Sequence, residues 1–188
     1  MVILQKHYSE PDSKDAIING INQITGDMAD EPLFLCIGSD RHILDCFGPL
    51  TGTMIKEKAP EMLVFGTLDK PINAKNLSQE ILAIKRQFSN RIAIAIDASA
   101  GGDEELGIVK IRQGPLLPGK ALAKGLPAIG DYSIIGMMGI RVDRRNLKTL
   151  HQGSISHVYQ MARLLSDAIA AWQAQSNLPR PLASPSDI

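Results

Sequence analysis

The sequence predicts an α/β protein whose parallel sheet is covered by helices on both faces. Short apolar runs at residues 33–37, 62–65 and 92–96 have the length and composition of buried strands. Between them lie segments with helically spaced apolar residues, at 46–58 and 76–89. This alternation of strands and helices with short links is typical of crossover connections between parallel strands.

The composition is that of an ordinary globular protein. The 188 residues suffice for one domain with a full core, so we expect a single domain over 1–188, with flexible ends at 1–11 and 177–188. Twenty basic residues balance twenty acidic ones, so the overall charge favours neither nucleic acid nor an anionic membrane as a partner. Two cysteines do not indicate a disulfide framework.

With no signal peptide and no apolar segment of about 20 residues, we expect a cytoplasmic protein. The oligomeric state stays open.

The remaining elements are predicted in the same way. Isoleucines at helical spacing predict a helix from residue 12 or 13 to 25, and Ser154 or Ser156 begins a final helix that ends near 175. Residues 107–112 alternate apolar and polar as in an edge strand. Residues 132–140 are apolar with interior glycines, which suits a strand that passes beneath a loop or a ligand.

Two aspartates follow the predicted strands. Asp45 lies at the far end of the polar loop after the first strand, directly before a helix, and Asp97 closes the run 92–96. If the strands lie in the order second, first, third, the carboxyl ends of the first and third strands meet in one crevice, where open parallel sheets bind their ligands. Two close carboxylates can share a proton and activate a water molecule.

Each aspartate also has a simpler interpretation, and these alternatives stay open at this point. Asp45 is a favoured residue type for a helix N-cap, and Asp97 for the start of an Asx-turn. The pair would also suit a divalent cation. His42 lies in the same loop as Asp45, but the histidines show no metal-type spacing. We therefore expect no cofactor and no firmly bound transition metal.

Several motifs resemble the YyaC-like sporulation proteins of endospore-forming bacteria. They are CIGSDRHILDCFGPLTG, VFGTLDKPINAKNL, IAIDASAGG, GPLLPGKAL and LPAIGDYSIIGMMG, and the likeness extends over about residues 33–172. That family resembles the spore germination protease and the endopeptidases that mature hydrogenases. The resemblance implies a three-layer α/β/α sandwich with a mostly parallel, mixed central sheet, of the phosphorylase/hydrolase-like type.

The resemblance also implies roles for individual residues. Asp45, three residues before Gly48, matches the first essential carboxylate of these proteases, and Asp97 matches the second. The segment Pro118, Gly119 and Lys120 resembles a segment near the cleft of the germination protease, with Leu117 where that protease has histidine. The metal-binding histidine of the hydrogenase enzymes has no counterpart that can be placed here.

The expected function is therefore a sporulation-associated endopeptidase of the forespore or spore, with a protein or peptide as substrate. Asp45 and Asp97 would be catalytic, and the long loop 114–130 would shape the cleft with its amides and with Lys120 or Lys124. We expect the substrate to be bound by residues of the two loops: Ser39, Asp40, His42, Pro118, Gly119 and Lys120. The alternatives are a non-catalytic binding module on the same fold and a metal-dependent hydrolase that uses Asp45, Asp97 and His42.

Overall fold

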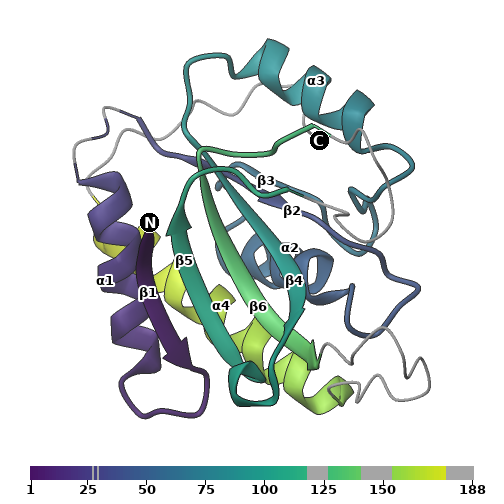
Figure 1. Ribbon diagram of the computed structural model, residues 1–188. Coiled ribbons are helices and arrows are strands. Elements are labelled where there is room, and N and C mark those ends of the chain that lie inside the picture. The colour runs from purple at the N-terminus through teal and green to yellow at the C-terminus, as the bar shows by residue number, and fades with distance from the viewer. Residues whose placement is uncertain (27, 29, 118–126, 141–153, 177–188) are drawn as a thin grey trace.

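The computed structural model describes residues 1–26, 28, 30–117, 127–140 and 154–176 (Figure 1). The elements follow one another as β1 (Val2–His7), α1 (Ser13–Thr25), β2 (Leu33–Cys36), α2 (Phe47–Lys58), β3 (Val64–Phe65), α3 (Leu77–Gln87), β4 (Ala93–Gly101), the short 3₁₀ helix η1 (Asp103–Glu105), β5 (Ile108–Gln113), β6 (Tyr132–Ile140) and α4 (Ile155–Gln175). The predicted helices and the strands of the crossover units are thus confirmed. No helix in these described segments is long and apolar enough to cross a membrane.

The strands form one mixed sheet in the order β1-β5-β6-β4-β2-β3. β3, β2, β4 and β6 run parallel to one another, whereas β5 pairs antiparallel with both β6 and β1. The predicted order of the first three apolar strands is confirmed, because β2 lies between β3 and β4. The carboxyl ends of β2 and β4 consequently meet at one edge of the sheet.

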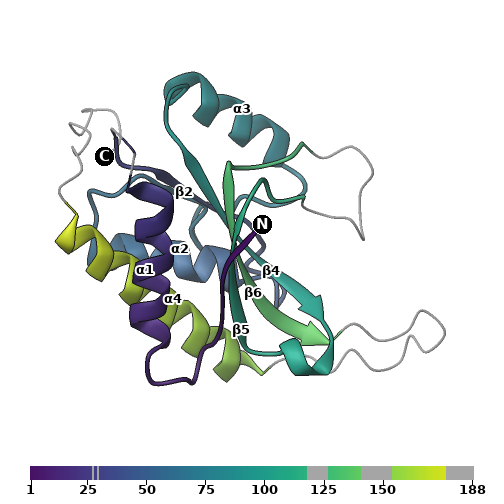
Figure 2. The same ribbon diagram turned by 60° about the vertical axis from the view of Figure 1, so that its left-hand side comes forward.

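Helices cover the two faces of the sheet to different extents (Figure 2). On one face, α1, α2 and α4 bury the larger core against residues such as Phe34, Ile96 and Ile111. On the other face, α3 packs Leu77, Ile81 and Ile84 against the residues of β2 and the first half of β4. These layers make the three-layer α/β/α arrangement that the sequence analysis expects. The second half of β4, with β5 and β6, lies beyond α3.

The amino-terminal segment corrects two expectations. Residues 1–11 are predicted to be flexible, but Val2–His7 forms β1 and pairs antiparallel with β5. For the same reason the prediction of an edge strand at 107–112 is wrong, because β1 covers the outer side of β5. The apolar run in β1 is short, and its partner lies about a hundred residues away in sequence. The expected flexible end at 177–188 lies outside the described residues.

Glycines permit a close approach between α2 and the ends of the strands. A Cβ at Gly48 would lie 2.1 Å from the carbonyl oxygen of Ile37, and one at Gly52 would lie 2.3 Å from that of Gly66, which follows β3. In β6, a Cβ at Gly136 would lie 2.7 Å from the ring of Phe47. β6 therefore passes beneath the start of α2, whereas the interior glycines of residues 132–140 predict a loop or a ligand above this strand. These contacts hold the segment before α2 against the carboxyl edge of the sheet.

We expect Gly48→Ala to destabilise the protein, because the added methyl group would collide with backbone rather than with a flexible side chain. Overpacking of this kind costs about 1–3 kcal/mol. Urea unfolding followed by circular dichroism measures the loss. Gly26→Ala is the matched control, since Gly26 has an α-helical φ of −57° and faces only the Asn22 carbonyl at 3.2 Å. Equal midpoints for the two variants would contradict the close packing of α2.

Candidate active site

Asp97 occupies the point where β4 loses its neighbour β2. The pairing of β2 with β4 ends at Cys36 and Ile96, and the amide of Ile37 donates to the Ile96 carbonyl at 2.7 Å. β4 itself continues to Gly101 beside β6, so the prediction that Asp97 closes the strand is wrong. The Asx-turn interpretation is wrong for the same reason, although the Asp97 carboxylate accepts a hydrogen bond from the Ala98 amide at 2.8 Å. Asp97 is thus the first residue of β4 beyond the end of β2.

Asp45 is brought back to the same edge by the loop that follows β2. The loop begins at Gly38, whose φ of +145° is strained for other residues, and a Cβ there would lie 2.0 Å from the Asp45 carbonyl oxygen. The amide of Ser39 donates to that carbonyl at 3.1 Å, which closes the loop on itself. Helix α2 starts at Phe47 with Cys46 as its N-cap and no side-chain capping bond. The interpretation of Asp45 as the helix N-cap is therefore wrong.

The charge of Asp45 acts on the carboxyl group of Asp97. The pKa of Asp97 is raised to about 7, mainly by burial; the Ala98 amide lowers it in part, and the negative charge of Asp45 contributes to the rise. Burial also raises the pKa of Asp45, while the positive charge of His42 and the Ser39 amide lower it. Asp45 and Asp97 thus lie in one electrostatic environment, with His42 on the side of Asp45.

This environment favours a pair of carboxyl groups that holds one proton near neutral pH. Burial disfavours the ionised form of Asp97, and the negative charge of Asp45 disfavours it further. The carboxyl that keeps its proton can donate it, and the ionised one can accept a proton from water. The arrangement can therefore supply an acid and a base at the same place.

The other candidate residues have different surroundings. Ser39 is half-buried and its hydroxyl accepts from the Arg41 amide at 3.2 Å, whereas Asp40 and His42 are exposed in the same loop. Burial and the charge of Asp45 both raise the pKa of the Cys46 thiol, which disfavours a thiolate nucleophile there. The expected substrate-binding residues Pro118, Gly119 and Lys120, and Lys124 with them, lie outside the described residues.

The described segments contain no group of three or more histidine, cysteine, aspartate or glutamate side chains placed to hold a metal ion. His42 remains near Asp45, but the pair and His42 do not form such a group.

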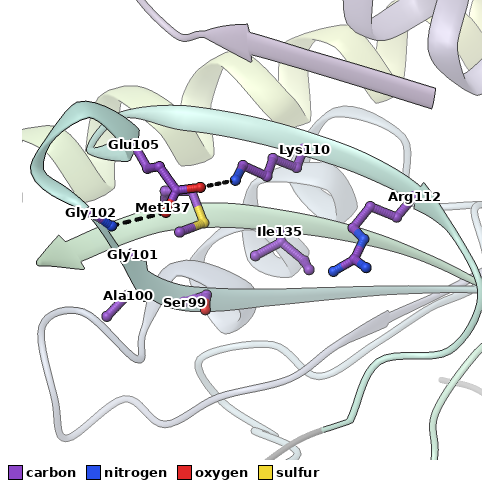
Figure 3. Close-up of a pocket in the computed structure, with 9 residues that line it drawn as sticks. All are labelled: Ser99, Ala100, Gly101, Gly102, Glu105, Lys110, Arg112, Ile135 and Met137. Atoms are coloured by element: carbon purple, nitrogen blue, oxygen red, sulfur yellow. Dashed lines mark hydrogen bonds and ion pairs between the residues drawn. The ribbon is translucent and has the colours of Figure 1, made fainter. Parts of the chain in front are cut away.

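A pocket that the sequence does not predict lies beside Asp97. It has a volume of about 410 Å³ and is lined by residues of β4, β5 and β6, including Ser99, Lys110 and Arg112 (Figure 3). The alternation in residues 107–112 is a signal for it, since the polar positions of a strand share one face. Only the register of β5 against β6 shows that this face is the one that carries Asp97.

A solved structure shares the α/β fold of this chain. The [NiFe] hydrogenase maturation protease HycI from Thermococcus kodakarensis KOD1 is similar with a TM-score of 0.54 and 17% sequence identity, over 82% of this chain and 99% of that chain. At this identity the likeness concerns the fold alone.

The sequence comparisons identify the family. The chain belongs to the family described as "Protein of unknown function (DUF1256)", whose model matches residues 5–168. It is 33% identical over 137 residues to the uncharacterized protein YyaC of Bacillus subtilis (strain 168). That match covers 72% of this chain and 66% of YyaC, so the chain spans about two thirds of its relative. The predicted resemblance to YyaC-like proteins is confirmed.

Proposed function

We propose that this protein is an endopeptidase in which Asp45 and Asp97 together activate a water molecule. The observation that carries the proposal is their placement: one carboxyl follows β2, the other lies in β4 just beyond β2, and the charge of Asp45 acts on Asp97. The carboxyl edge of a parallel sheet, where the strand order reverses, is where α/β folds bind their ligands. The protease-like fold agrees with this assignment.

In the proposed reaction, the pair begins with one proton. Asp97, whose pKa is raised to about 7, holds that proton and donates it to the carbonyl oxygen of the scissile peptide bond. The ionised Asp45 takes a proton from water as the water oxygen bonds to the carbonyl carbon, which gives a neutral tetrahedral diol. The C–N bond then breaks as Asp45 delivers its proton to the leaving nitrogen and Asp97 recovers one from the diol. Each proton is accounted for, and no metal enters a step.

The substrate that we propose is a protein or peptide of the spore, and the site of action is the cytoplasm of the forespore or spore. This part of the proposal depends on the YyaC-like resemblance and on the match to YyaC of a Bacillus species. Ser39, Asp40 and His42 lie in the loop that carries Asp45, so an extended peptide bound at Asp45 would pass over them.

The pH dependence of cleavage tests the proposal. We expect the rate to fall as the pH rises through about 7, because Asp97 then loses the proton that it donates. It should also fall at acidic pH, where Asp45 becomes protonated. Denatured spore proteins serve as substrates, and new peptide amino termini are counted by mass spectrometry at each pH.

Two controls accompany this profile. A chelator such as EDTA should leave the rate unchanged, because the proposed steps use no metal. A rate that rises steadily above pH 8 would contradict the shared proton, and loss of activity with EDTA that zinc restores would favour a metal-dependent hydrolase. Absence of new termini at any pH would favour the non-catalytic binding module.

A further inference from the structure

The pocket beside Asp97 lies on the part of the sheet that α3 does not cover. Asp97 in β4 pairs with Ile135 in β6, and Ile135 in turn pairs with Lys110 in β5, so these residues form one row across the sheet. Neighbouring strands are about 4.8 Å apart, which places the β5 end of the row about 10 Å from Asp97. Ser99 and Met137 form the next row toward the carboxyl end. A peptide bound at Asp97 therefore reaches the pocket with an adjacent side chain.

Two basic side chains, Lys110 and Arg112, line the pocket, and they differ in whether a carboxylate pairs with them. Lys110 forms an ion pair with Glu105, and these side chains are only 16% and 28% exposed. The Glu105 carboxylate also accepts from the Gly102 amide at 2.9 Å, so the ion pair is held in place (Figure 3). The positive charge of Lys110 is thereby largely neutralised.

Among the described residues that line the pocket, Arg112 supplies the positive charge that no carboxylate neutralises. Figure 3 shows its side chain extending from β5 toward Ile135, with the guanidinium at the side of the pocket. Among the residues that the structure describes, no carboxylate lies within ion-pair distance of Arg112. A guanidinium presents planar donors that match a carboxylate with two parallel hydrogen bonds.

We propose that this pocket is a subsite for an acidic side chain of the substrate next to the scissile bond, with Arg112 as the residue that binds its carboxylate. The inference rests on the proposed peptidase function and gives that function a substrate class. Ile135 and Met137 offer an apolar surface for the methylene groups of a glutamate, while Arg112 meets its charged end. The ion pair of Lys110 and Glu105 borders the subsite and limits its size.

The cleavage specificity of Arg112 variants tests the subsite. Wild-type protein is incubated with a mixture of short peptides of randomised sequence, and the cut peptides are identified by mass spectrometry. We expect glutamate or aspartate to be enriched at one fixed position near the cut. Arg112→Gln should lower kcat/KM for such peptides by about tenfold and leave their amide counterparts unchanged, since a hydrogen bond to a charged group contributes about 1.5 kcal/mol.

Two further variants complete the test. Arg112→Glu should reverse the preference toward lysine or arginine at the same position. Arg163→Gln is the matched control, because Arg163 is an exposed arginine of α4 on the opposite face of the sheet. Cleavage with no acidic preference, or a preference that Arg112→Gln leaves intact, would overturn the subsite while leaving the peptidase assignment standing.

A binding measurement separates failure of the subsite from failure of the peptidase. The same peptide mixture is passed over immobilised wild type and over immobilised Arg112→Gln, and the retained peptides are compared. If the wild type cuts nothing, the peptidase proposal fails, but retention of acidic peptides by the wild type alone would still support the subsite. Equal retention of acidic and amide peptides on both proteins would overturn it.

Discussion

Asp45→Asn and Asp97→Asn should each lower peptide cleavage by about a thousandfold or more while the protein stays folded. Asparagine keeps the size of aspartate but neither takes nor gives a carboxyl proton near neutral pH. General acid–base catalysis by one positioned group contributes about 10²–10⁴-fold to a rate, and here the charge of Asp45 also helps to keep the proton on Asp97. Cleavage of one identified peptide measures kcat and KM, and thermal melts measure folding.

The double variant distinguishes a pair from two separate residues. If Asp45 and Asp97 act as one unit, Asp45→Asn combined with Asp97→Asn should be scarcely slower than either single variant. Asp69→Asn is the matched control, because Asp69 is an exposed loop aspartate outside the candidate site. Wild-type turnover in a folded Asp45→Asn or Asp97→Asn protein would exclude the proposed mechanism. Losses that multiply in the double variant would indicate independent roles.

The elements that determine the site are largely visible in the sequence, because their signals are local. The apolar runs that become β2 and β4 are bounded by Gly38 and by Asp97, and the helical spacing of α3 lies between them in sequence. Short links between such elements leave few possible topologies, so β2 and β4 can be predicted to be neighbouring strands. This is why the meeting of Asp45 and Asp97 at one edge can be expected from the order of the elements along the chain.

The parts that sequence analysis misses depend on long-range pairing. β1 gains its stability by pairing with β5, and nothing in Val2–His7 itself specifies that partner. Likewise, the row from Asp97 to Lys110 exists only through the register of β4, β6 and β5. A one-residue slip of β5 would turn Lys110 and Arg112 to the opposite face of the sheet. A pattern along the chain therefore does not predict the pocket.

Asp45 shows a second reason why a residue's role is hard to predict from the sequence. Aspartate before a helix is so often an N-cap that residue type alone favours that interpretation. In the structure the helix begins one residue later, with Cys46 at the N-cap, and the carboxyl of Asp45 is left to interact with Asp97. Because α2 starts one residue later than the sequence predicts, Asp45 is not a helix cap and its carboxyl group is available for chemistry.

The raised pKa of Asp97 predicts that the site reduces the stability of the fold, and that Asp97→Asn is more stable than wild type above pH 7. Between the ordinary pKa of 3.8 and the folded-state value of about 7, the folded protein binds more protons at Asp97 than the unfolded chain does. Stability must therefore fall as the pH rises through this window and level off above it. A pKa change of this size corresponds to at most roughly 4 kcal/mol.

Asparagine stays neutral at every pH in this window, so the stability of the variant should not fall for this reason as the pH rises. We expect Asp97→Asn to match wild type near pH 4 and to exceed it at pH 8 by about 2–4 kcal/mol, as measured by urea unfolding at a series of pH values. Subtracting the two curves removes the contribution of all other titrating groups that the substitution leaves unchanged. A difference that does not vary with pH would mean that Asp97 is not the buried acid of the site. Such a result would remove the proton donor from the proposed mechanism, whatever the cleavage assays show.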